Sequence, residues 1–323
     1  MKAMLITAHG QPLKLADVPI PEPSVGEVRI RVDATGVNYA DLLLISGTYQ
    51  EKPSLPFSPG MEFCGRIDSV NDPVSELKTG QRVIAFAGHG GMAEYCCIPA
   101  GHCIAIPEAM QTEAAAGFLI AYLTAHIALE HRAQLKPGER LLVLGAAGGT
   151  GLSAVEVGKL MGAEVIAAAR GAGRLQTALR AGADHAIDTG CEDLRESVNG
   201  LGGADVVFDP VGGEQFRAAM RSANPEARLL PIGFASGEVP QIPANILLVK
   251  NLTVIGVYCG GYRKFRPEVI SDSAQTLLTW HREGHLNPTI SHIIPLDEAN
   301  VALDLLRQRK SVGKVVIRVG GDF

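Results

Sequence analysis

The sequence lacks the features that mark membrane, secreted and nucleic-acid-binding proteins. Its 323 residues contain no run of 18 or more apolar residues, and the N-terminus shows no long apolar region with a cleavage site. We therefore expect neither a membrane span nor a secretory signal. The formal net charge is −5 and no basic block is present, which argues against a nucleic-acid partner.

Paired metal-binding cysteines are also missing, because none of the six cysteines forms a C-x-x-C pair. Scattered thiols without a signal peptide predict a reducing, cytoplasmic location. The cluster Cys96, Cys97, His102 and Cys103 is the one group that invites a metal interpretation. Neighbouring residues on a strand point to opposite faces, so Cys96 and Cys97 cannot both reach one ion without a kink. We expect no metal there and interpret these residues as buried small side chains.

Length and composition fit a soluble two-domain protein, with 46% hydrophobic and 20% charged residues. Short apolar segments between turn residues predict a β-rich barrel or sandwich in residues 1–121. Alternating strands and helices in residues 122–259 predict a doubly wound parallel sheet, and residues 260–323 are expected to return to the first domain. The expected strands of the sheet are 141–144, 165–169, 185–187, 204–208, 228–232 and 252–258, and the longer helices 112–129, 174–181, 214–220, 267–283 and 296–309.

One stretch, residues 141–170, reads as a strand, a glycine-rich turn, a helix and a second strand. Glycines in such a turn let the backbone approach a pyrophosphate, and the first N–H groups of the helix point at the anion. The spacing is Ala146-x-Gly148-x-x-Gly151, with alanine at the first glycine position. The alternative is a tight turn with no ligand. The residues predicted to bind the dinucleotide here are Ala147, Gly148, Gly149, Thr150 and Gly151.

The end of the second strand indicates which dinucleotide binds. NAD-specific enzymes place Asp or Glu about 20 residues after the glycines, whereas this chain has Ala169, then Arg170 and Arg174. Two guanidinium groups suit the 2′-phosphate of NADPH, because a planar fork pairs well with phosphate oxygens. The alternative is that both arginines simply face water at a helix start.

Several further segments stand beside the glycine turn, namely Gly36–Asp41, Ser46–Tyr49, Pro59–Gly65, Gly91–Tyr95, Leu135–Glu139 and Val312–Lys314. With these segments the chain resembles the medium-chain dehydrogenase/reductase superfamily, and within it the zinc-independent quinone oxidoreductase group. The resemblance covers nearly the whole chain and implies a GroES-like barrel catalytic domain, interrupted by a Rossmann domain, with the cofactor in the cleft between them.

The resemblance also addresses the metal. Zinc-using relatives place a cysteine where this chain has Asn38 and a histidine where it has Met61, and an amide with a thioether is not a zinc site. The four-cysteine lobe of those relatives is missing after residues 80–86. A zinc alcohol dehydrogenase is therefore not expected. What remains is hydride transfer to an acceptor polarised by its own conjugation, a quinone or a small α,β-unsaturated carbonyl.

Two residues are candidates for the catalytic site. Asn38 is expected near the nicotinamide ribose or the substrate oxygen, or else it only caps a helix. Tyr49 matches an aromatic residue at the active site of quinone reductases and can stack or donate its hydroxyl, or it packs a loop. Relatives often have a second tyrosine where this chain has Leu43, which implies a more apolar pocket. Further cofactor contacts are expected at the carboxyl ends of strands, from Gly233, Phe234, Val257 and Tyr258.

Other readings stay open. Reduction of enoyl thioesters would need cationic groups, which Arg263, Lys264 and Arg266 could supply. A non-catalytic NADPH-binding redox sensor is the alternative from a different class. The apolar run Leu252–Val257 is expected to be an open sheet edge, and such edges invite pairing, so we predict a homodimer through it.

Overall fold

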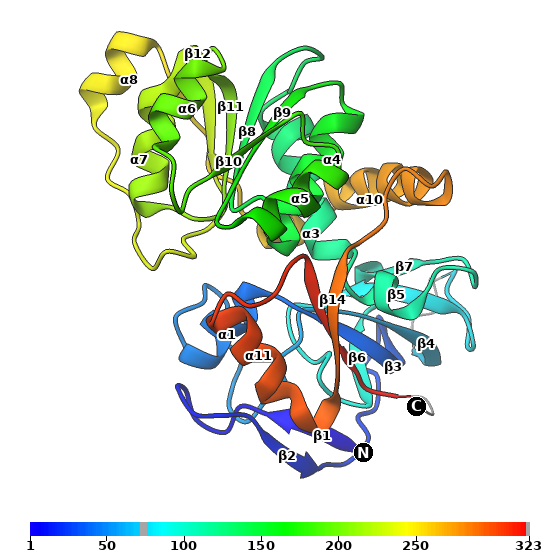
Figure 1. Ribbon diagram of the computed structural model, residues 1–323. Helices are drawn as coiled ribbons and strands as arrows, with labels where there is room; N and C mark the ends of the chain where they lie inside the picture. Colours follow the sequence, from blue (N-terminus) through cyan, green and yellow to red (C-terminus); the bar gives the residue numbers. More distant parts are fainter. Residues whose placement is uncertain (72–75, 321–323) are drawn as a thin grey trace. The chain divides into compact units, whose positions relative to one another are not determined.

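The computed structural model describes residues 1–71 and 76–320 and contains two compact units (Figure 1). Unit 1 comprises Met1–Ile120 and Pro288–Phe323, and unit 2 comprises Ala121–Asn287. The return to the first unit therefore comes at residue 288, not at 260 as the sequence suggested. The reason is packing, because the His126 ring lies against Trp280 with centroids 5.5 Å apart and its Nδ1 is 3.1 Å from Ser273 Oγ.

Unit 2 is built on a parallel sheet whose described strands run in the order β10-β9-β8-β11-β12-β13. The chain winds from β8 outward through β9 to β10, then crosses to β11 on the other side of β8, which makes the sheet doubly wound. The predicted fold class is thereby confirmed. The strands are β8 (Arg140–Leu144), β9 (Glu164–Ala169), β10 (His185–Asp188), β11 (Ala204–Asp209), β12 (Ala223–Pro231) and β13 (Thr253–Val254).

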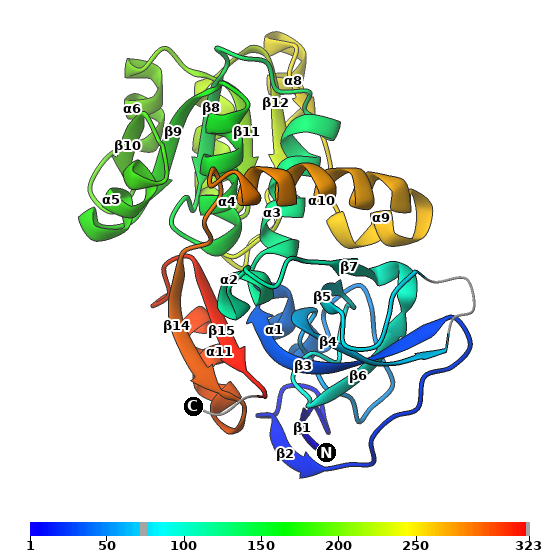
Figure 2. The same cartoon turned by 90° about the vertical axis from the view of Figure 1, so that its right-hand side faces the viewer.

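Helices cover both sides of this sheet (Figures 1 and 2). The strands between them are almost wholly apolar, as expected for strands buried on both faces. The segment 112–129, predicted as one helix, is divided near Gly117. The helices of this region and of unit 2 are α2 (Thr112–Ala116), α3 (Leu119–His126), the π-helix η2 (Ile127–Arg132), α4 (Gly149–Leu160), α5 (Ala172–Arg180), α6 (Leu194–Gly200), α7 (Gly213–Ser222), α8 (Ala244–Lys250), α9 (Cys259–Phe265) and α10 (Pro267–Arg282).

Unit 1 is the β-rich unit, with a mainly antiparallel sheet in the order β14-β15-β3-β4-β5-β7 among the described strands and β6 paired to β3. A separate hairpin is formed by β1 (Lys2–Leu5) and β2 (Lys14–Asp17). The other elements are β3 (Glu27–Val37), α1 (Tyr39–Ser46), β4 (Glu62–Asn71), β5 (Arg82–Phe86), β6 (Tyr95–Pro99), η1 (Ala100–His102), β7 (Cys103–Ala105), β14 (Ile290–Pro295), η3 (Leu296–Glu298), α11 (Ala299–Arg307) and β15 (Lys314–Arg318).

The sheet edge of unit 2 differs from its expected length. The run 252–258 was predicted to be one strand, but β13 holds only Thr253 and Val254, which pair with Arg228 and Leu229 of β12. Gly256 cannot add a side chain to the sheet face, and glycine weakens a strand interior. The edge position itself agrees with the expectation. None of the described helices is long and apolar enough to cross a membrane.

Candidate functional site

The glycine turn joins β8 to the N-terminus of α4, and its glycines differ in how much space they leave for a side chain. A Cβ added at Gly151 would lie 2.2 Å from the Gly145 carbonyl oxygen, so the fold itself excludes a side chain there. At Gly148 the nearest atom to an added Cβ is the same oxygen at 3.5 Å, an ordinary contact. Gly148 is exposed and is the N-cap of α4. The turn thus has open space in front of a helix N-terminus, where anions bind.

This turn lies at the point where the winding of the sheet reverses. Strand β8 pairs with β9 on one side and β11 on the other, and a Cβ at Gly145 would lie 2.9 Å from Val211, in the loop after β11. In open parallel sheets, ligands bind outside the carboxyl ends of the strands at such a reversal. Of the other predicted residues of the turn, Ala147 is buried while Gly149 and Thr150 are half-exposed.

The two arginines predicted to bind the 2′-phosphate of the cofactor follow β9. Arg170 is exposed, directly after the strand, and Arg174 is half-exposed in the first turn of α5. The structure adds a carboxylate that the sequence did not reveal. Asp188 of β10 accepts the N–H groups of Gly171 and Gly190, both at 2.9 Å, and these bonds hold its pKa below the ordinary value, with help from Arg170. Strand register explains why Asp188 lies beside the loop that begins with Arg170, because Asp188 pairs with Ala169.

A buried carboxylate also organises the loop after β11. Asp209 is fully buried, and its Oδ1 accepts the N–H groups of Val211 at 2.7 Å and Gly212 at 2.9 Å. Burial raises the pKa of Asp209 to about 6, although these hydrogen bonds oppose the rise. The sequence signal was present in the Asp209-Pro210-x-Gly212-Gly213 run after an apolar strand, since Asp often accepts from the backbone that follows it.

The aromatic residues predicted at the strand ends lie on glycine loops. A Cβ at Gly212 would lie 3.1 Å from the Phe234 ring, so Phe234 packs over the loop after β11. The Tyr258 ring lies over the first turn of α9, where added Cβ atoms at Gly260 and Gly261 would come within 3.1 and 2.9 Å of it. Phe234 is 38% and Tyr258 39% exposed, whereas Val257 is buried and Gly233 half-exposed.

Asn38 of unit 1 belongs to a buried polar network. Its Nδ2 donates to the Gly36 carbonyl at 3.2 Å and to Glu62 Oε1 at 3.0 Å, and its Oδ1 accepts from Lys314 Nζ at 2.7 Å. Lys314 Nζ also lies 2.7 Å from Glu62 Oε1, in an ion pair whose side chains are 6% and 1% exposed. The sequence offered no signal for this network, because Lys314 lies 276 residues from Asn38.

Helix α1 begins next to this network. Asn38 is its N-cap residue, and the Asp41 carboxylate accepts the backbone N–H groups of Asn38 at 2.9 Å and Gly60 at 3.0 Å. Burial raises the pKa of Asp41 to about 6 against these hydrogen bonds. Asn38 thus occupies the N-cap position of α1, but its side chain makes no cap hydrogen bond and is engaged instead with Gly36, Glu62 and Lys314.

Zinc does not fit these residues. The Asn38 amide oxygen, which stands where zinc-using relatives have a cysteine, already accepts from an ammonium group that would repel a dication. Met61 is 2% exposed and packs in an apolar cluster with residues such as Phe57 and Met92. Among residues 1–71 and 76–320, no group of three or more His, Cys, Asp or Glu side chains is placed to hold a metal ion.

The other predicted residues of unit 1 lie in packed surroundings. Tyr49 is half-buried against the apolar cluster that contains Leu44 and Ile45. Cys96 is buried, and Cys97 and Cys103 are half-buried. Burial raises the pKa of the Cys96 and Cys103 thiols, which disfavours the thiolate form that binds metals.

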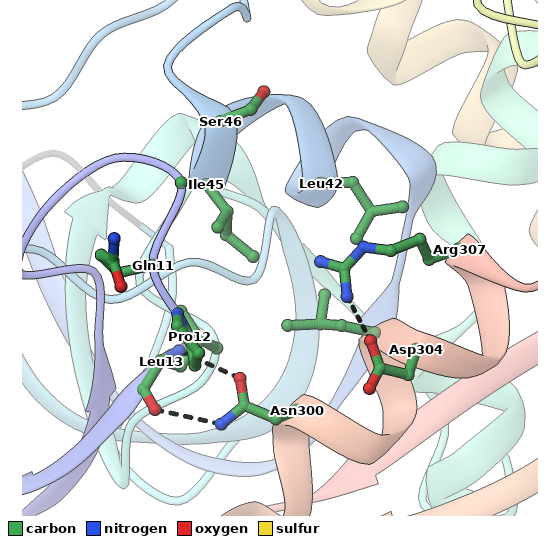
Figure 3. A pocket seen from close by; sticks show the side chains of 11 residues that line it. Gln11, Pro12, Leu13, Leu42, Ile45, Ser46, Asn300, Asp304 and Arg307 are labelled. Carbon is green, nitrogen blue, oxygen red and sulfur yellow. Dashed lines mark hydrogen bonds and ion pairs between the residues drawn. The ribbon is translucent and has the colours of Figure 1, made fainter.

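A cavity of about 400 Å³ lies elsewhere in unit 1, between the loop at Gly10–Leu13, the end of α1, and α11 (Figure 3). The side chains of Asn300, Asp304 and Arg307 are engaged with the protein. The Asn300 amide accepts from the Leu13 N–H and donates to the Leu13 carbonyl, both at 3.0 Å, and Arg307 pairs with Asp304. We assign this cavity no role in the chemistry.

A doubly wound sheet with a glycine turn at its winding reversal, in one chain with a GroES-like β unit, defines a dehydrogenase or reductase of the medium-chain type. Two family models match, "Alcohol dehydrogenase GroES-like domain" at residues 24–108 and "Zinc-binding dehydrogenase" at residues 149–275.

Individual proteins match over nearly the whole chain. The quinone oxidoreductase-like protein 2 of Bos taurus is 40% identical, over 98% of this chain and 92% of its own. The Escherichia coli quinone oxidoreductase complexed with NADPH has a TM-score of 0.93 at 27% identity, over 98% of this chain and 100% of that one. The Thermus thermophilus quinone oxidoreductase, described with its NADPH complex, has a TM-score of 0.86 at 34% identity and the same coverage.

The chain belongs to the zinc-independent quinone oxidoreductase group of the medium-chain dehydrogenase/reductase superfamily.

Proposed function

We propose that this protein is an NADPH-dependent, zinc-independent oxidoreductase that transfers hydride to quinones or small α,β-unsaturated carbonyls. The observation that carries the proposal is the glycine turn of unit 2. Gly151 has no side chain because the fold excludes one, whereas Gly148 is exposed and has room for a Cβ. A glycine that packing does not require, at a helix N-terminus, is explained by a ligand that needs the same space.

The remaining cofactor contacts follow from the same sheet edge. Arg170 and Arg174 would bind the 2′-phosphate, because guanidinium groups pair with phosphate oxygens. The Escherichia coli and Thermus thermophilus quinone oxidoreductases are described in complex with NADPH, which supports this choice of dinucleotide for the chain. Backbone groups at Gly233, Phe234, Val257 and Tyr258 would hold the nicotinamide half.

Bound NADPH would supply the hydride, and the protein supplies position and hydrogen bonds. Asn38 is the polar group proposed beside the nicotinamide ribose or the substrate oxygen, and Tyr49 is proposed to stack on the acceptor or donate its hydroxyl. The Asn38–Glu62–Lys314 network occupies the position where zinc-using relatives hold the metal. Without a metal Lewis acid, the acceptor must be polarised by its own conjugation. Among the cations that an enoyl thioester would need, Arg266 is already paired with Glu268 at 2.9 Å, so we favour small acceptors.

We also propose a homodimer that forms along the edge strand β13. Strand β13 pairs with β12 on one side, and open edges pair readily. The neighbouring helix α8 exposes Leu248 by 77% and Val249 by 73%, apolar side chains that a second copy would cover.

The test measures oxidation of the cofactor by its absorbance, with protein that has been treated with a chelator. The acceptors are 1,4-benzoquinone, 9,10-phenanthrenequinone, a 2-alkenal and an acrylyl thioester, and each is offered with NADPH and with NADH. We expect turnover of a quinone or the alkenal with NADPH, unchanged by the chelator. Binding of NADPH without turnover of any acceptor would refute the enzyme and favour the redox sensor. Turnover that the chelator abolishes would refute metal independence.

A further inference from the structure

The loops that follow β9 and β10 are tied together by one side chain. Asp188, the last residue of β10, accepts the backbone N–H groups of Gly171 and Gly190 with the same oxygen, Oδ1, at 2.9 Å each. Gly171 belongs to the loop after β9, and Gly190 belongs to the loop after β10. The two hydrogen bonds therefore fix the distance between these loops, and Arg170 lies in the first of them.

Asp188 is itself held in place. Its backbone N–H donates to Glu192 Oε1 at 2.8 Å, and its carbonyl oxygen accepts the Glu192 N–H at 2.8 Å. The Thr189 N–H donates to the Ala169 carbonyl at 3.0 Å, so the pairing of β10 with β9 continues one residue beyond Asp188. The hydrogen bonds that the Asp188 carboxylate accepts lower its pKa, which keeps it ionised and strengthens both bonds.

The stem of the Arg170 side chain lies on Gly190. A Cβ added at Gly190 would be 3.2 Å from Arg170 Cγ and 3.0 Å from Asp188 Oδ1, and both distances are shorter than an ordinary contact. A side chain at position 190 would therefore displace the Arg170 stem, the Asp188 carboxylate or both. In the part of the chain that the structure describes, no carboxylate forms an ion pair with Arg170. Its exposed guanidinium thus keeps donors for an anion.

We propose that Asp188 and Gly190 are positioning residues that hold the Arg170 guanidinium where it binds the 2′-phosphate, and that they thereby set the preference for NADPH over NADH. This inference rests on the proposed function and deepens it, because both residues act through Arg170 and not on the cofactor. An arginine side chain loses rotational freedom when it binds a ligand, and a stem that is already fixed lowers this cost. Only the dinucleotide with a 2′-phosphate gains from it.

The experiment measures dissociation constants for NADPH and NADH by calorimetry and compares their ratio between variants. Asp188→Ala removes both hydrogen bonds, Asp188→Asn keeps an oxygen that can accept them, and Gly190→Ala places a methyl group against the Arg170 stem. Each substitution is made in the wild type and in Arg170→Ala. Two matched controls are used. Asp193→Ala removes a carboxylate that accepts a backbone N–H of α6 at 2.8 Å, and Gly200→Ala adds a Cβ that meets no atom within 4 Å.

We expect Asp188→Ala to lower the preference for NADPH about fivefold, the effect of one lost hydrogen bond, and Gly190→Ala to lower it about threefold. Asp188→Asn should keep the wild-type preference or exceed it, because it removes a negative charge near the phosphate. Both controls, and all three substitutions in the Arg170→Ala background, should leave the preference unchanged. The inference is overturned by an unchanged preference in Asp188→Ala or Gly190→Ala, by equal losses in Asp188→Asn and Asp188→Ala, or by equal losses with and without Arg170.

Failure of the proposed cofactor site gives a different result. If Arg170 does not bind the 2′-phosphate, Arg170→Ala by itself leaves the preference of the wild type unchanged. A loss of preference in Arg170→Ala without a loss in Asp188→Ala keeps the cofactor assignment and rejects the positioning role.

Discussion

The two glycines of the turn provide a sharp test of the cofactor site. We compare Gly148→Ala with Gly151→Ala, which add the same methyl group three residues apart. At Gly151 the Cβ would lie 2.2 Å from the Gly145 carbonyl oxygen and 2.9 Å from Ala146 Cα, both backbone atoms that cannot swing away. At Gly148 the shortest distance is 3.5 Å, and its φ of −78° suits alanine.

These distances set the expected changes in stability and in NADPH affinity. The overlap at Gly151 forces a backbone shift, which should destabilise unit 2 by about 1–3 kcal/mol, the usual range for overpacking. At Gly148, alanine is a poorer N-cap than glycine but loses less chain entropy on folding, so the two effects leave stability within about 1 kcal/mol of the wild type. A methyl group before the helix N-terminus would nevertheless displace a phosphate from backbone N–H groups, and losing one such charge-assisted bond weakens binding about tenfold or more.

The assay combines urea unfolding with NADPH titration of each variant. Unfolding is followed by the fluorescence of Trp280, the single tryptophan of the chain, which lies in unit 2. We expect Gly148→Ala to keep its unfolding midpoint and lose NADPH affinity, and Gly151→Ala to lose stability. If Gly148→Ala binds NADPH as tightly as the wild type, the phosphate does not lie at this turn and the reasoning is refuted.

Two further predictions concern the cofactor phosphate and the assembly. Arg170→Ala should raise the Kd for NADPH about tenfold and leave that for NADH unchanged, since only NADPH carries the 2′-phosphate; Arg180→Ala, at the other end of α5, is the control, and equal losses for both dinucleotides would contradict the assignment. Replacing Leu248 and Val249 by lysine should convert a dimer to a monomer in light scattering at micromolar concentration, whereas Val25→Lys, also highly exposed, should not; a wild-type monomer would rule out the dimer.

The sequence predicted unit 2 well because its signals are local. Buried parallel strands are apolar runs, and Gly148 and Gly151 mark the turn between the first strand and its helix. The ends of the helices and strands were predicted less well. The helix expected over 112–129 is divided near Gly117, and the short β13 replaces a longer predicted strand, because tertiary packing decides how far an apolar run stays in a sheet.

The polar networks could not be predicted, because they depend on residues that are distant in the chain. Lys314 reaches Asn38 only through the pairing of β15 with β3, and Asp188 reaches the loop of Arg170 only through the pairing of β10 with β9. Asn38 shows the consequence. The sequence left a helix cap and a catalytic polar group as alternatives, and only the contacts with Glu62 and Lys314 reveal which hydrogen bonds the side chain has left to form.

A third buried network, in unit 2, predicts a pH dependence of stability. Glu156 of α4 accepts from the Tyr122 hydroxyl at 2.5 Å and from the Asn287 backbone N–H. Burial raises the pKa of Glu156 to about 7 from an ordinary value of 4.5. Because the folded pKa is the higher one, the stabilisation from protonated Glu156 is complete below about pH 4.5 and is lost as the pH rises through 7. A shift of this size corresponds to about 3 kcal/mol at most.

Glu156→Gln removes this titration and keeps an oxygen that can accept both hydrogen bonds. Urea unfolding followed at Trp280 should therefore give similar stabilities for variant and wild type at pH 5, and a variant more stable by up to about 3 kcal/mol at pH 8. Asp41 and Asp209, whose pKa values burial also raises, titrate in both proteins and cancel in the difference. Tyr122→Phe should act in the opposite direction, because the ionised carboxylate loses a donor and its pKa rises further. A difference between Glu156→Gln and the wild type that stays constant from pH 5 to 8 would mean that Glu156 is already ionised at the lower pH, and that the hydrogen bonds of Tyr122 and Asn287 outweigh its burial.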